Sequence, residues 1–214
     1  MKRALATLLL LSLLTLSLLS CGGGAPVTEE ELFPAVRTLL EGSQLVNTVM
    51  IGPGIPKKGE AFDEYVHDEG YSYADEAWCE ERGLGSVADI RTATEAVYTA
   101  PVANILYRKA LSTDHDMLGD YRDRALGRGI LVLTAREGWY TDTENEYLFD
   151  TMTLTEAAAN TATVSLTVRV TRGELPPQER TLTLPLVRGK DGVWRCDKLT
   201  YVAYDEGLNE ENKS

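Results

Sequence analysis

An alternation of apolar and polar residues near the C-terminal end limits the folds open to this chain more than any other feature. Between residues 163 and 171 every second residue is Val or Leu, and the residues between them are Thr, Ser or Arg. Successive side chains of a β-strand point to opposite faces, so a period of two predicts an antiparallel strand with one buried and one solvated face.

Further strands are predicted after this one. Leucines at alternate positions repeat the pattern beyond a turn at 173–177, namely Leu182, Leu184 and Leu186. A second turn, Gly189–Gly192, precedes a last strand predicted over 193–204. Pro185 donates no ladder hydrogen bond, so we expect it at an edge or a bulge. The chain is therefore predicted to end in a meander of three to four long strands.

The first half of the chain is predicted to be mainly helical. Thr28-x-x-Glu31 is a capping box ahead of apolar residues with helical spacing, and the helix begins either before Pro34 or with Pro34 in its first turn. Ser86 and Thr99 open two further helices, and short strands are expected around 62–85 and 129–135. Helices followed by strands predict an α+β fold in which helices pack on one face of a curved antiparallel sheet.

The first twenty residues have the pattern of a secretory leader. Met1-Lys2-Arg3 is positively charged and residues 4–19 are rich in Leu, a stretch too short to span a bilayer comfortably. The residues Leu18-Leu19-Ser20-Cys21 resemble a bacterial lipobox, which implies cleavage before Cys21, acyl chains on that cysteine and stable anchoring to a membrane. The alternative is an ordinary secreted protein with an unrelated cysteine at this point. Residues 21–27, rich in Gly, are then a flexible stalk.

The chain that follows the leader is strongly acidic. Residues 1–20 hold two of the 21 basic residues and none of the 33 acids, so the remainder has a formal net charge of −14. This charge excludes a general nucleic-acid-binding protein and favours a basic partner. Residues 28–206 have the size of a single domain, and 207–214 are predicted to be a disordered acidic tail.

Besides Cys21, the sequence has two cysteines, Cys79 and Cys196. Outside the cytoplasm they could form a disulfide across a long loop, which would stabilise the fold by about 4–5 kcal/mol. The other interpretation is two separate buried thiols that pack as small apolar groups. The sequence leaves both open.

The sequence is poor in groups that perform catalysis. His67 and His115 are the only histidines, and acids next to Cys79 would raise the pKa of its thiol rather than activate it. The stretch Asp114–Asp123 lacks the glutamate that ends a calcium loop, and Asp142, Glu144 and Glu146 lack its glycine, so neither group predicts a metal site. We therefore expect neither a metal nor another cofactor, and we do not predict an enzyme.

The most unusual surface candidate is the stretch Arg136–Phe149. Trp139 and Tyr140 stand beside three alternating acids, Asp142, Glu144 and Glu146. Aromatic anchors with a charged rim are typical of protein-binding patches. The alternative, in which the two rings simply close the core at a strand end, is the commoner role for such residues.

The stretch LVRGKDGVWRCDKLTY resembles the C-terminal hairpin of NTF2-like (cystatin-like) domains, which are common in bacterial lipoproteins. The order of elements also resembles the secreted inhibitors of cell-wall DL-endopeptidases from Gram-positive bacteria, through Tyr98-Thr99 before a helix and Trp194 after Asp191-Gly192. The second resemblance implies an extracellular protein that plugs the catalytic groove of a cysteine peptidase.

Three hypotheses about function follow. The first is a lipoprotein on the extracytoplasmic face of a bacterial cell membrane that binds a basic protein partner such as a cell-wall hydrolase, with inhibition as the outcome. The second is an NTF2-like domain that binds a small ligand in a pocket between helices and sheet. The third is an enzyme of unknown type.

Overall fold

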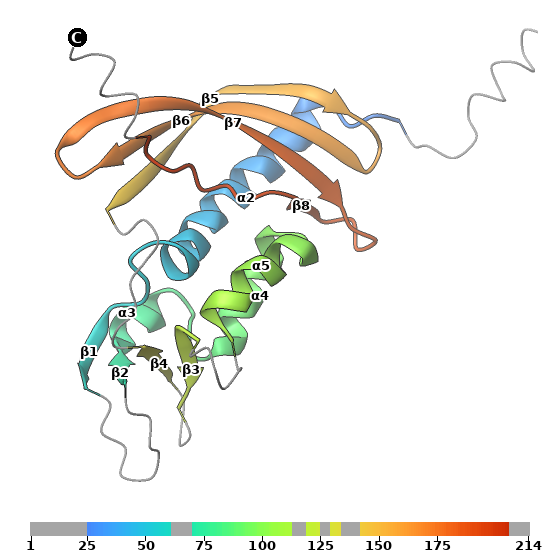
Figure 1. The fold of residues 1–214 in the computed structure, drawn as a ribbon. Coiled ribbons are helices and arrows are strands. Elements are labelled where there is room, and N and C mark those ends of the chain that lie inside the picture. The colour runs from blue at the N-terminus through green and yellow to red at the C-terminus, as the bar shows by residue number, and fades with distance from the viewer. Residues whose placement is uncertain (1–24, 61–69, 113–118, 125–128, 134–141, 206–214) are drawn as a thin grey trace, which may run out of the picture.

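The structure, a computed structural model, describes residues 25–60, 70–112, 119–124, 129–133 and 142–205. The expected leader, the lipid attachment at Cys21 and the tail 207–214 lie outside these residues. So do His67, His115, Trp139 and Tyr140. Within the described residues the fold is α+β, with helices and two antiparallel sheets (Figure 1).

The larger sheet contains the predicted meander. Its strands stand in the order β5-β6-β7-β8, every pair antiparallel, with bounds β5 Thr143–Ala157, β6 Thr161–Arg172, β7 Leu175–Arg188 and β8 Trp194–Cys196. On β6 the apolar set Val164, Leu166, Val168 and Val170 is buried, as the alternation predicts. Three strands are long and the fourth is short.

Pro185 lies one residue before the part of β7 that pairs with β8, since β8 pairs only with Leu186–Arg188. The Asp197 N–H donates to the Pro185 carbonyl at 2.9 Å. A residue in a strand directs its nitrogen and its carbonyl to the same side, so the N–H that proline lacks would also have pointed toward β8. The ladder between β6 and β7 therefore loses no hydrogen bond at this position.

The last strand is shorter than the sequence predicts. Only Trp194–Cys196 pairs with β7, and residues 197–205 cross the inner face of the sheet as an irregular segment. Side-chain amides take the place of a ladder: Asn145 exchanges two hydrogen bonds with the Val202 backbone at 2.8 and 2.7 Å, and Gln178 does the same with Asp205 at 2.7 and 3.0 Å. The backbone N–H and C=O groups of Val202 and Asp205 are thus satisfied without strand pairing.

Helix α2, Glu29–Met50, covers the inner face of the larger sheet (Figure 1). The predicted capping box is present, since the Glu31 N–H donates to Thr28 Oγ1 and the Thr28 N–H donates to the Glu31 carboxylate. The helix therefore begins before Pro34, which lies inside it. Val27 donates a backbone hydrogen bond to Ala158 at 3.3 Å and ties the start of the helix to the turn between β5 and β6.

A second sheet, which the sequence does not predict as a unit, lies at the other end of α2. Its order is β1-β2-β4-β3, with bounds β1 Lys57–Glu60, β2 Tyr71–Ala74, β3 Tyr121–Asp123 and β4 Ile130–Leu133. The Tyr121 hydroxyl donates to the Val49 carbonyl at 2.7 Å and accepts from the Ile55 N–H at 3.2 Å, which ties this sheet to the end of α2.

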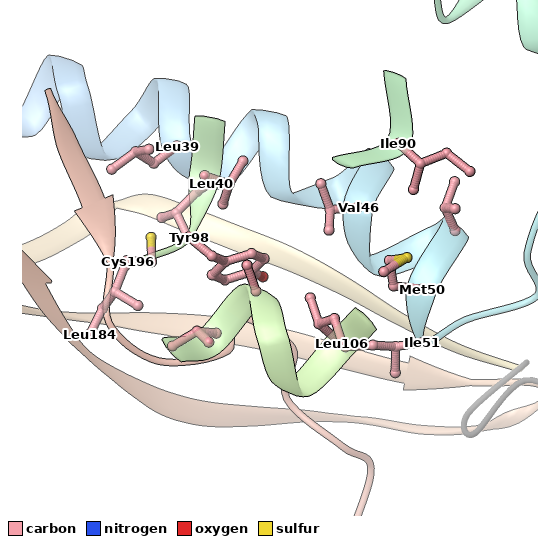
Figure 2. Close-up of a cluster of buried hydrophobic side chains, with 14 of the residues drawn as sticks. Leu39, Leu40, Val46, Met50, Ile51, Ile90, Tyr98, Leu106, Leu184 and Cys196 are labelled. Atoms are coloured by element: carbon pink, nitrogen blue, oxygen red, sulfur yellow. The ribbon is translucent and has the colours of Figure 1, made fainter. Parts of the chain in front are cut away.

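Three further helices complete the fold: α3 Glu76–Glu81, α4 Val87–Val97 and α5 Ala100–Ala110. Figure 2 shows the core that α4 and α5 share with α2 and the larger sheet, with Leu40 on the side of Tyr98 and Cys196 and with Met50 on the side of Leu106. These side chains are at most 3% exposed and belong to one continuous apolar cluster.

Candidate functional site

At the start of β5, exposed and buried side chains alternate. Asp142, just before the strand, and Glu144 and Glu146 within it are exposed, whereas Thr143 and Tyr147 are buried. Because side chains alternate along a strand, the three acids lie on the outer face and the intervening residues face α2. The structure thus brings together the three described acids of the predicted partner-binding patch.

Arginines of β6 neutralise two of these acids. Arg172 pairs with Asp142 at 2.9 Å, and Arg169 pairs with Glu146 at 2.8 Å and with Glu179 at 3.4 Å. The hydrogen bond from Arg172 holds the pKa of the Asp142 carboxyl below its ordinary value. Among the described residues, no side chain pairs with the Glu144 carboxylate, so it carries the uncompensated charge of this patch.

A pocket of about 370 Å³ adjoins the same strand on its inner side. Residues of β5 form one wall, and the C-terminal end of α2 with the loop after it forms another; Gln44, Asn47, Thr48, Gly52, Pro53, Thr143, Glu144, Asn145, Tyr147 and Tyr201 line it. This lining combines amides, hydroxyls and two tyrosines with one acid and no lysine or arginine. Its chemistry suits a neutral or positively charged polar group.

Behind the pocket lies a buried polar cluster of Ser43, Asn47, Tyr98, Tyr147 and Thr200. Asn47 Nδ2 donates to Thr200 Oγ1 at 2.9 Å and to the Tyr147 hydroxyl at 3.3 Å, and Asn47 Oδ1 accepts from the Tyr98 hydroxyl at 3.0 Å. The Tyr98 hydroxyl also lies 2.7 Å from Thr200 Oγ1.

This cluster joins α2, the connection between α4 and α5, β5 and the C-terminal segment. Burial raises the pKa of both tyrosines, which keeps them protonated as hydrogen-bond donors. One wall of the pocket is therefore held by a network in which each side chain fixes its neighbours.

The two cysteines are free and buried, so the disulfide that the sequence left open is absent from the structure. Cys79 lies on α3 and Cys196 on β8, each packed in the apolar core. Burial raises the pKa of Cys79, with a further contribution from the Asp75 carboxylate, and it raises the pKa of Cys196 to about 12. Both thiols thus have the character of core side chains.

The other candidate groups either have structural roles or lie outside the residues that the structure describes. In the acidic stretch 114–123, the Asp123 carboxylate accepts a hydrogen bond from the Val87 N–H at 2.7 Å at the start of α4. Within the described ranges, no group of three or more His, Cys, Asp or Glu side chains is placed to hold a metal ion. No described helix combines the length and the apolar character needed to cross a membrane.

Comparison with known proteins gives no relative: neither a scan against protein-family models nor a search of curated proteins found a match for this chain.

The sequence predicted neither the residues of this pocket nor the buried cluster, although one of the three hypotheses placed a pocket between helices and sheet. The available signal was the pair Ser43 and Asn47, which lie four residues apart on the apolar stripe of α2 where further apolar residues are expected. Two polar residues on a buried helix face predict a hydrogen-bonded partner in the core. The partners themselves, Tyr98, Tyr147 and Thr200, are too distant in sequence for their contact to be predicted.

Replacing Asn47 tests the buried cluster. Asn47→Leu keeps a side chain of similar size but removes its hydrogen bonds to two tyrosines and a threonine, so we expect the free energy of unfolding to fall by about 3 kcal/mol. Urea denaturation measures this change. Gln44→Ala, at an exposed position one turn earlier, should stay within about 0.5 kcal/mol of wild type. Equal losses in the two variants would contradict the assignment.

Thiol labelling tests the burial of the cysteines, in a Cys21→Ser background so that only Cys79 and Cys196 can react. A thiol with an ordinary pKa of 9.0 is mostly thiolate at pH 10, whereas Cys196, with its pKa raised to about 12, stays protonated there. We expect labelling of Cys196 with an aromatic disulfide reagent to remain slow at pH 10 in the native protein and to become fast in urea. Equally fast labelling in both conditions would show that this thiol is accessible.

Proposed function

We propose that the protein is a lipoprotein on the extracytoplasmic face of a bacterial membrane that binds a basic protein partner through the start of β5. The observation that carries the binding role is the exposed patch of Asp142, Glu144 and Glu146, in which Arg172 and Arg169 compensate two acids and leave Glu144 uncompensated. The leader and the lipobox-like Leu18–Cys21 support the location.

Charge favours this partner class. The chain after residue 20 has a formal net charge of −14, and a uniformly acidic protein attracts and orients a basic partner over long range. Resemblance to the secreted inhibitors of DL-endopeptidases makes a cell-wall hydrolase the first partner to examine, with occlusion of its catalytic groove as the mode of inhibition. Binding is proposed instead of catalysis because both described thiols are buried and have raised pKa values.

The finer description of the fold as NTF2-like (cystatin-like) is also a proposal. It is supported by the position of α2 on the inner face of the larger sheet. The pocket of about 370 Å³ favours a second candidate function, the binding of a small polar ligand, since its volume falls within the range of ligand sites. A ligand bound there would contact Gln44 and Tyr201, and Glu144 is the one outer acid that lines the pocket.

The membrane anchor is tested by Cys21→Ser. Without the thiol no acyl chain can be attached, so the variant should leave the membrane fraction and lose incorporation of labelled palmitate. Ser20→Ala, which keeps a small residue before the cysteine, should retain both properties. Wild-type protein that takes up no palmitate would refute the lipoprotein assignment.

The partner-binding patch is tested by Glu144→Lys. Reversing the uncompensated charge should weaken binding to a basic cell-wall hydrolase about tenfold at low salt, and less at 1 M salt where the Debye length is about 3 Å. Glu80→Lys makes the same charge change at an exposed position of α3 and should leave affinity close to wild type. Titration calorimetry measures both. Equal affinities of the two variants at low salt would remove the start of β5 as the binding surface.

A further inference from the structure

The start of β5 is an open sheet edge. β5 is the first strand in the order β5-β6-β7-β8 and pairs on one side only. Near its far end the edge is engaged, because Glu29 accepts from the Leu154 N–H and Val27 donates to Ala158. Between Thr143 and Leu148, in the part of the chain that the structure describes, no backbone group of another segment bonds to this edge. Alternate residues here direct N–H and C=O groups outward without a partner.

This stretch is also regular. Its pairing with β6 runs without a shift from Thr143↔Arg172 to Leu148↔Thr167, and the first irregularity falls between Leu148 and Thr153. A bulge bends a strand and disrupts its ladder, so the segment before it is the part of β5 best able to accept another strand. Its length, about 20 Å, accommodates an extended peptide of about six residues.

Charge decides which segment can pair here. A second copy of the chain would bring two sets of the acids Asp142, Glu144 and Glu146 together across the new pair, and like charges in cross-strand positions are destabilising. Lysine or arginine at alternate positions of an added strand would instead stand next to these acids. The edge thus disfavours self-association and suits a basic segment.

The pocket lies on the inner side of the same edge. Thr143, Asn145 and Tyr147 line it from β5, and Gln44 and Thr48 line it from α2. Side chains of an added strand alternate between the two faces, so those between the basic residues would point toward this pocket. A volume of about 370 Å³ equals roughly a dozen waters at 30 Å³ each, enough for one polar side chain and its hydration.

We propose that an extended segment of the partner, with basic residues at alternate positions, adds to the larger sheet along Thr143–Leu148 and places an intervening polar side chain in the pocket lined by Asn145 and Tyr147. This inference rests on the proposed function, because it gives the binding mode of the same patch. Main-chain hydrogen bonds to the edge supply affinity, while the acids and the pocket select the sequence.

The probe is an acetylated and amidated peptide of alternating lysine and threonine, seven residues long, added to the purified full chain in detergent. Two derivatives carry N-methyl groups on either every lysine or every threonine nitrogen. Every second residue of a strand directs its N–H group to the same edge, so N-methylation removes the hydrogen bonds to β5 in only one of the two derivatives. We expect one derivative to bind at least about tenfold more weakly than the parent peptide and the other within about threefold.

Hydrogen exchange locates the peptide. Amides of Thr143–Leu148 should exchange more slowly with the parent peptide present, whereas the amides of Gln178–Leu184, in the part of β7 that β8 does not pair with, should not change. Glu144→Lys should weaken peptide binding about tenfold, and the matched Glu80→Lys should not. A glutamate–threonine peptide of the same length should not bind.

The outcomes separate this inference from the proposed function. Equal binding of the two N-methylated peptides, or protection outside β5, would overturn strand addition. A cell-wall hydrolase that binds in a Glu144-dependent way while no basic peptide binds would leave the proposed function standing and overturn the inference. Peptide binding at β5 with no affinity for any hydrolase would support the inference and remove the hydrolase as the partner.

Discussion

The inner face of the larger sheet is apolar along β6 and β7 and has to be shielded from water by other parts of the chain. Val164, Val168 and Leu184 are fully buried there, and each such side chain contributes about 1.5–3 kcal/mol when it leaves water. Helix α2 and the irregular segment 197–205 both contribute buried side chains to this cover. The α4–α5 connection bonds to β8 through the Thr99 N–H, while the smaller sheet lies at the far end of α2 (Figure 1).

Apolar contact alone would allow α2 to slide or rotate on the sheet. Asn47 removes that freedom. The hydrogen bonds of its side-chain amide to Tyr98, Tyr147 and Thr200 can all form only in one arrangement of helix and sheet. The same bonds fix Tyr147 and thereby the inner wall of the pocket, while on the outer face the register with β6 places arginines beside two of the acids. Packing, polar contacts and the candidate site thus depend on one helix–sheet contact.

Short sequence patterns predicted the elements that are stabilised by interactions between neighbouring residues. The capping box at Thr28 and the alternation of β6 are read from neighbouring residues, and both were confirmed. The predicted strand over 193–204 was wrong beyond Cys196, because long-range bonds from Asn145 and Gln178 hold that segment in another conformation.

The same distinction holds at the candidate site. The sequence marked Asp142, Glu144 and Glu146 as acids beside two aromatic residues, but it did not predict that they lie on one face of a strand. Their pairing with Arg169 and Arg172 could not be predicted, because it depends on the register between two strands. The pocket likewise needs the C-terminal end of α2 to meet β5, a contact between residues about a hundred positions apart.

The hydrogen bond between Val27 and Ala158 has a consequence for how far the protein can stand from a bilayer. With an acyl chain on Cys21, only residues 22–26 separate the lipid from this fixed point, a tether of about 20 Å when fully extended. The turn between β5 and β6 would then lie close to the lipid headgroups. The opposite end of the 15-residue β5 is up to about 50 Å from this turn, measured along the strand. The open edge at the start of β5 would thus be the part of this strand farthest from the anchored turn.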